Sequence, residues 1–203
     1  MKLLFNILFV LFITALALPS DARSLTPVEG LEALRKSFAG MNDFTADLVQ
    51  EKRLSVMKKK LVMQGKIRFR KPDLFFMELF PPYNARVLLK DTVLQQRMGQ
   101  NGDLQRIVLP SEQGLSHWFS TVARPVTKVP DGIEIRAEQA GQQTTVLIRP
   151  NSGGQLKELM VSLHNDGTVR KLILLERTGD RTEMNFHKIK KNVGLTEADF
   201  SLE

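Results

Sequence analysis

Hydrophobic and polar residues alternate with a period of two along most of the chain from Phe44 onward. This alternation is typical of strands that bury one face and expose the other. Short strand-like stretches recur between turn signals such as Pro81-Pro82, Asn101-Gly102 and Asp166-Gly167. Links this short favour antiparallel neighbours over parallel strands joined by helices. The pattern therefore predicts an α+β fold that is mainly one antiparallel sheet of about ten or eleven strands.

The clearest strand covers residues 65–71. Ile67 and Phe69 point to one side of it, and basic residues point to the other. Pro72 interrupts the ladder, and residues 74–80 form the next strand. This second strand carries apolar side chains on both faces, which predicts that both of its faces are covered.

Two helices are predicted outside the sheet. Thr26 and Glu29 form a capping box around Pro27 at the first helical position, and Gly40 ends this helix. A second helix is predicted between Ser111 and Val122, because apolar residues recur there at i, i+3, i+4 and i+7. These residues are Leu115, Trp118, Phe119 and Val122.

The N-terminus has the pattern of a secretory signal peptide. Lys2 precedes an apolar run from Leu3 to Leu18, and small residues follow. The run is shorter than the roughly 20 residues that span a membrane. We expect cleavage after Ala22 or Ala17, export to the cell envelope, and a single domain over residues 23–203.

The composition argues against most catalytic chemistry. The chain has no cysteine, so it has no disulfide, no thiolate nucleophile and no acceptor for a lipid anchor. His117, His164 and His187 lie far apart and lack metal-ligand spacing. The sequence has no hydrolase elbow, zinc-protease helix or phosphate-binding glycine loop. We therefore expect no enzyme activity, no cofactor and no metal.

Positive charge is concentrated in one segment. The formal net charge is +7, and the basic residues between Lys52 and Lys71 have no acidic residue among them. Such a segment suits an anionic membrane or an acidic partner, although a solvated strand face explains it equally well. Nucleic acid is not expected, because exposed aromatic residues are not interleaved with the charges. The predicted docking residues are Lys52, Arg53, Lys58, Lys59 and Lys60.

Several short motifs resemble the LolA-like family of periplasmic carriers of outer-membrane lipoproteins. The stretches 44–50 and 65–75 are similar to the family's entry strands. Residues 154–157, 166–169 and 198–200, together with Glu176, are similar to its closing strands in order and spacing. The resemblance covers most of the residues after the predicted signal peptide.

This resemblance implies a curved, half-open barrel whose concave face is covered by helices acting as a lid. An apolar cavity under the lid would take acyl chains. Its expected mouth includes Phe75 and Met77, its floor Ile67 and Phe69, and the underside of its lid Trp118 and Phe119. The complete set of expected lipid-binding residues is Ile67, Phe69, Phe75, Met77, Leu79, Leu115, Trp118 and Phe119.

A lid latch is also implied. In the family an arginine directly before the proline reaches the backbone of the lid, and here this position is Lys71, with Arg70 one residue earlier. Alternation places Lys71 on the side of Ile67 and Phe69, so it is the better latch candidate. A lysine lacks the planar fork of arginine, which predicts a looser latch. The alternative is that Lys71 only snorkels at a strand end.

The function that follows is a monomeric periplasmic carrier that shuttles lipoprotein acyl chains from the inner to the outer membrane. An inner-membrane transporter would load it and an outer-membrane acceptor would unload it. Two alternatives remain open: a carrier of another amphiphile, such as a glycolipid or polyene lipid, and a lipid-sensing regulatory domain.

Overall fold

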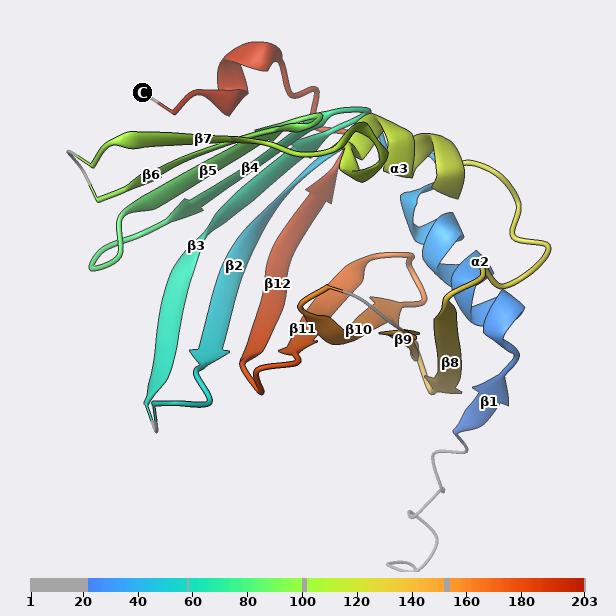
Figure 1. The fold of residues 1–203 in the computed structure, drawn as a ribbon. Helices are drawn as coiled ribbons and strands as arrows, with labels where there is room; N and C mark the ends of the chain where they lie inside the picture. Colours follow the sequence, from blue (N-terminus) through green and yellow to red (C-terminus); the bar gives the residue numbers. More distant parts are fainter. Residues whose placement is uncertain (1–21, 58, 100–101, 152–153, 203) are drawn as a thin grey trace, which may run out of the picture.

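The computed structural model describes residues 22–57, 59–99, 102–151 and 154–202. The predicted signal peptide lies outside this range except for Ala22. The first strand, β1, begins directly after that residue (Figure 1).

A single curved sheet of twelve antiparallel strands accounts for most of the described chain (Figure 1). Its spatial order is β1-β8-β9-β10-β11-β12-β2-β3-β4-β5-β6-β7, so β1 and β7 are free edges and the sheet does not close. This strand order confirms the predicted half-open, mainly antiparallel architecture. The sheet has twelve strands, slightly more than the ten or eleven predicted. The strands are β1 (Arg23–Leu25), β2 (Asp43–Arg53), β3 (Lys60–Arg70), β4 (Leu74–Leu79), β5 (Ala85–Lys90), β6 (Val93–Met98), β7 (Leu104–Val108), β8 (Ile133–Ala140), β9 (Gln143–Pro150), β10 (Leu156–His164), β11 (Val169–Glu176) and β12 (Arg181–Lys191).

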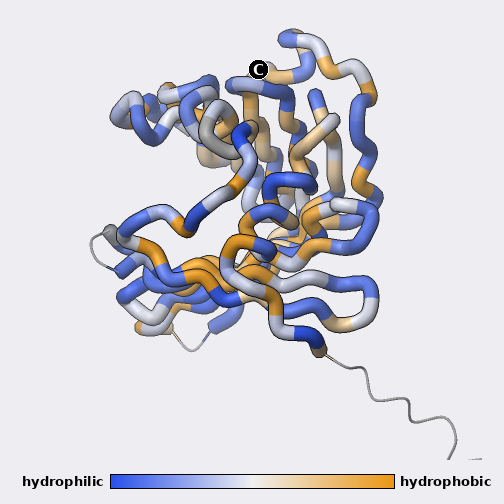
Figure 2. The backbone as a smooth tube through the Cα atoms, turned by 90° about the vertical axis from the view of Figure 1, so that its right-hand side faces the viewer, coloured by the Kyte–Doolittle hydropathy of each residue, from blue (hydrophilic) through white to orange (hydrophobic). Residues whose placement is uncertain are grey.

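The alternation in β3 explains the core of the sheet. Ile67 and Phe69 are each 4% exposed, and they lie opposite Ala46 and Phe44 of β2. Cross-strand apolar pairs of this kind contribute about 0.2–1 kcal/mol each. Figure 2 shows the resulting distribution, with hydrophobic stretches along the strands and hydrophilic ones in many of the turns.

The first predicted helix is confirmed as α2 (Pro27–Phe38), with the capping box between Thr26 and Glu29 in place. It lies against β8 and β9. Gly30 makes this approach possible, because a Cβ there would lie 2.4 Å from the Cβ of Ala137.

The second predicted helix is divided in two. A 3₁₀ turn, η2 (Ser111–Gln113), precedes the helix α3 (Leu115–Val122). The interruption falls at Gly114, whose position leaves no room for a side chain: a Cβ would lie 2.8 Å from Asp91 Oδ1.

Both faces of β4 are covered, as its sequence predicts. On the convex side, Leu74 and Phe76 form a buried cluster with Phe200 from the 3₁₀ segment η3 (Glu197–Phe200). The C-terminal segment thus lies on the outside of the sheet (Figure 1). Within the described residues, no helix is long and apolar enough to cross a membrane.

Candidate functional site

An apolar cavity of about 330 Å³ lies between the helices and the concave face of the sheet. Its volume falls at the lower end of the range of about 300–1,000 Å³ that is common for small-ligand sites. Ser37, Thr168 and Lys191 are its polar lining side chains. The complete lining is Leu34, Ser37, Phe38, Met41, Phe44, Ile67, Phe75, Trp118, Ile148, Leu159, Val161, Gly167, Thr168, Val169, Leu172, Phe186, Ile189 and Lys191.

Among the eight expected lipid-binding residues, Ile67, Phe75 and Trp118 lie on the cavity wall. The structure brings them together from β3, β4 and α3. Met77 and Leu79 are not among the lining residues; they pack in the core formed around β2, β3 and β4, which Ile67 and Phe75 also contact.

The remaining three expected residues, Phe69, Leu115 and Phe119, lie beside the cavity. The rings of Phe69 and Phe119 are 4.9 Å apart between centroids, and Leu115 packs against the same buried cluster. These three side chains attach α3 to the sheet without contributing to the cavity lining.

The lining residues that sequence reasoning missed come mainly from α2 and from β9 to β12. Phe38 on α2 and Val161 on β10 are examples. An alternating strand pattern identifies a buried face, but it does not distinguish a wall that faces a cavity from one that faces packed side chains.

Aromatic contacts join the two helices into one cover. The Phe38 ring lies edge-on to Trp118, with 5.3 Å between centroids, and Phe38 also contacts Phe119 at 6.0 Å. Trp118 and Phe119 are 4.6 Å apart in a T-shaped arrangement. Edge-to-face pairs of this kind add about 0.5–1.5 kcal/mol each beyond area burial. The end of α2 and α3 are therefore expected to move together.

Glu32 connects α2 to the segment that follows α3. Its carboxylate accepts hydrogen bonds from Arg35 at 2.7 Å and from the Val126 backbone N–H at 3.3 Å. The bond from Arg35, followed by that from Val126, lowers the pKa of Glu32 to about 2.

Lys71 links the sheet to this cover. Its Nζ donates a hydrogen bond of 2.6 Å to the backbone carbonyl of Phe38, the last residue of α2. The same ammonium lies 5.6 Å from the centroid of the Phe119 ring, within the range of a cation–π contact. Burial lowers the pKa of Lys71. Arg70 points to the other face, where its guanidinium lies 6.0 Å from the Phe200 ring.

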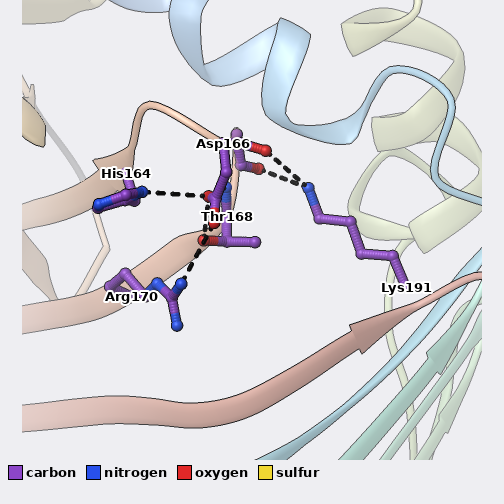
Figure 3. Close-up of polar contacts among 6 residues, drawn as sticks. His164, Asp166, Thr168, Arg170 and Lys191 are labelled. Carbon is purple, nitrogen blue, oxygen red and sulfur yellow. Dashed lines mark hydrogen bonds and ion pairs between the residues drawn. The ribbon is translucent and has the colours of Figure 1, made fainter. Parts of the chain in front are cut away.

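A polar network closes one side of the cavity at the β10–β11 turn (Figure 3). Lys191 Nζ donates to the carbonyl oxygen of Gly167 at 2.9 Å. A Cβ at Gly167 would lie 3.5 Å from the Ser37 Cα, so the turn also lies close to α2. The turn thus lies between the end of β12 and the helix.

Asp166 organises this turn. Its Oδ1 accepts hydrogen bonds from the hydroxyl and the backbone N–H of Thr168, and its Oδ2 lies 3.2 Å from Arg170 (Figure 3). The hydroxyl bond from Thr168 is the main cause of a lowered pKa for Asp166. His164 Nδ1 lies 3.6 Å from the same carboxylate. The Asp166-Gly167 turn was visible in the sequence, whereas nothing there connected Lys191 with it.

The predicted docking residues lie at the ends of β2 and β3. Lys60 forms an ion pair of 2.7 Å with Glu51. Arg53 and Lys59 are exposed, and Lys52 is half-buried. Lys58 lies outside the described residues. Across the described chain, no three His, Cys, Asp or Glu side chains gather closely enough to hold a metal ion.

The curved open sheet with its helix-covered cavity is a LolA-like fold. The family model for the outer membrane lipoprotein carrier protein LolA matches residues 39–203. The chain therefore belongs to this family, which confirms the resemblance found in the motifs. Among curated proteins, no match to the chain is found.

Solved structures resemble this chain at low sequence identity. A conserved protein from Thermus thermophilus has a TM-score of 0.52 at 11% identity, covering 87% of this chain and 93% of that chain. The MucA/MucB complex of Pseudomonas aeruginosa gives 0.50 at 12% identity, covering 88% and 62%. A LolA superfamily protein from Nitrosomonas europaea gives 0.45 at 10% identity, covering 87% and 98%.

Proposed function

We propose that this protein is a periplasmic carrier that binds the acyl chains of lipoproteins in its apolar cavity and moves them from the inner to the outer membrane. The single observation that carries the proposal is the cavity itself, in a member of the LolA family. Its lining is almost entirely apolar, and it is covered by helices that are tied to the sheet at Lys71. The proposal involves no bond breaking and no cofactor.

The physical need for such a cavity is large. Each methylene transferred from water to an apolar site contributes about 0.8 kcal/mol, so an acyl chain of about sixteen carbons costs on the order of 12 kcal/mol if left in water. A carrier must shield the acyl chain from water and still be able to release it. The cavity of about 330 Å³ is small. Binding of several acyl chains would therefore require α2 and α3 to move away from the sheet.

The carrier is proposed to be a monomer of one domain over residues 23–203, released after removal of a signal peptide of residues 1–22. An inner-membrane transporter would load it, and an outer-membrane acceptor would receive the cargo. The basic residues 52–60 are proposed as a docking surface.

The test is to purify the protein from the periplasm and identify bound lipid by mass spectrometry. Phe75 lines the cavity, so we expect Phe75→Glu to lose both co-purified lipid and binding of a fluorescent fatty acid. Phe80→Glu is the matched control, because Phe80 is 36% exposed and lies outside the cavity lining. If Phe75→Glu bound lipid as well as Phe80→Glu does, the proposal would be contradicted.

The same measurement separates the carrier of another amphiphile from the lipoprotein carrier. The specific observation in its favour is Lys191, the one charged side chain among the described residues that line this largely apolar cavity, which suits an anionic headgroup. Free lipids among the co-purified ligands would support this alternative, whereas acyl chains attached to protein would support the lipoprotein carrier.

A further inference from the structure

The tip of the β2–β3 hairpin exposes two consecutive apolar side chains. Val56 is 91% exposed and Met57 is 48% exposed. A backbone hydrogen bond of 3.1 Å from Met57 N to Leu54 O closes the turn that carries them. Turns of this kind normally hold Gly, Asn, Asp, Ser or Pro, so valine and methionine are unusual occupants.

Contacts with the neighbouring hairpin fix the position of this tip. The backbone N–H and the hydroxyl of Ser55 donate to Asp180 Oδ1, at 2.7 and 2.9 Å. Asp180 lies in the turn between β11 and β12, where Gly179 also approaches Ser55. The two apolar side chains are thus held out from the sheet by a braced turn.

Positive charge surrounds the apolar tip. Arg53 and Lys59 are exposed and form no ion pair with any described residue, and Lys52 is half-buried nearby. Two acidic side chains lie beside the tip. Glu51 is paired with Lys60, whereas Asp180 keeps its negative charge while it accepts from Ser55, so Lys52, Arg53 and Lys59 outnumber it. An anionic bilayer has an apolar interior beneath negatively charged headgroups. Exposed apolar side chains next to basic ones match this arrangement.

The hairpin also lies in line with the cavity. Ile67 lines the cavity, and Met63 and Leu61 follow on the same face of β3 toward the tip, since side chains two apart share a face. The tip is at the end of the sheet far from α3 and the C-terminal segment (Figure 1). Contact with a membrane at this point would therefore place the concave face of β3 next to the lipid.

We infer that the β2–β3 tip is a membrane-docking element, in which Val56 and Met57 enter an anionic phospholipid bilayer while Lys52, Arg53 and Lys59 contact its phosphates. The purpose of this docking rests on the proposed carrier function. Membrane binding itself requires no cargo and is measured separately from acyl-chain binding.

The first test is flotation of the purified protein with vesicles. We expect binding to vesicles of phosphatidylglycerol and phosphatidylethanolamine, weakening as salt is raised, and much less binding to phosphatidylcholine. Val56→Asp should weaken this binding about tenfold. Val108→Asp is the matched control, because Val108 is 61% exposed on the edge strand β7, away from the hairpin.

The second test reports insertion directly. The chain has no cysteine, so Val56→Cys and Val108→Cys each provide a unique site for an environment-sensitive dye. We expect a blue shift and a several-fold gain in emission at position 56 when anionic vesicles are added, and no change at position 108.

The inference is overturned if the unmodified protein does not bind anionic vesicles, if Val56→Asp binds as well as the unmodified protein, or if the dye at position 56 stays in water. Absence of vesicle binding would leave a protein partner as the occupant of this tip. Fatty-acid binding by Val56→Asp should be unchanged, whereas a failure of the carrier function would appear as absent fatty-acid binding in the unmodified protein.

Discussion

The ammonium nitrogen of Lys71 lies 2.6 Å from the backbone carbonyl oxygen of Phe38, and so joins the turn after β3 to the last residue of α2. Carbonyl groups at a helix C-terminus lack partners within the helix and attract positive charge. This carbonyl otherwise accepts only a long hydrogen bond of 3.4 Å from the backbone N–H of Met41. The contact from Lys71 therefore adds a charged donor at the end of α2 while it holds the cover of the cavity against the sheet. We propose that it is the latch that opens when cargo enters or leaves.

Replacing Lys71 with Ala should speed the release of a bound fluorescent fatty acid about tenfold, since a hydrogen bond from a charged group contributes about 1.5–3 kcal/mol. Stopped-flow displacement of the probe measures this rate. Arg70→Ala is the neighbouring control, because Arg70 lies on the other face of the sheet. A latch role would be excluded if Lys71→Ala released the probe at the unmodified rate.

Filling the cavity should block binding without unfolding the protein. Val161 is 3% exposed and lines the cavity, so the larger ring in Val161→Phe has space to occupy. We expect loss of probe binding with little change in melting temperature. The same change at Val146, which is fully buried and not part of the cavity lining, should destabilise the protein by about 1–3 kcal/mol through overpacking. Thermal melts of the two variants measure the contrast, and equal melting temperatures would contradict it.

The elements with a strong local pattern could be predicted from the sequence. The alternation around Ile67 and the capping box at Thr26 both depend on neighbouring residues, and the structure has a strand and a helix there. The strand β3 begins at Lys60, five residues before the predicted strand of residues 65–71, and ends at Arg70. The three-residue strand β1 was missed because it is too short to show alternation.

The cavity could be predicted only in part. Ile67, Phe75 and Trp118 line it, but Phe69 and Phe119 face each other, and their separation from the cavity depends on where α3 lies. The contact between Lys191 and Gly167 at the edge of the cavity was not predicted. These residues are far apart in the chain and meet only because the end of β12 lies beside the β10–β11 turn. Sequence patterns identify buried faces, whereas tertiary packing decides which of them enclose empty space.

Gly30 should prove necessary for the position of α2. In an isolated helix, Gly→Ala is stabilising by about 1 kcal/mol. Here a Cβ would lie 2.4 Å from the Cβ of Ala137, so Gly30→Ala has to displace α2 from β8. We expect a lower melting temperature and a changed affinity for the fatty-acid probe. The double variant Gly30→Ala, Ala137→Gly should restore much of the loss, and a more stable single variant would disprove the close approach.

Glu183 should make part of the stability dependent on acid. Hydrogen bonds, first from Lys171 and then from Arg181 and Asn185, lower the pKa of Glu183 from 4.5 to about 2. Because the folded state holds this carboxylate ionised more strongly than the unfolded state, the stabilisation is fully present above pH 4.5 and is lost as the pH falls toward 2. Glu183→Gln should therefore be less stable than the unmodified protein at pH 7, and the difference should narrow below pH 4.5.

Thermal melts between neutral and acidic pH measure this convergence. Glu138→Gln is a suitable control, since Glu138 is exposed on β8 and forms no ion pair with a described residue. We expect its melting temperature to follow the unmodified protein at every pH. A constant difference between Glu183→Gln and the unmodified protein across the acidic range would show that Glu183 contributes through packing and not through its charge.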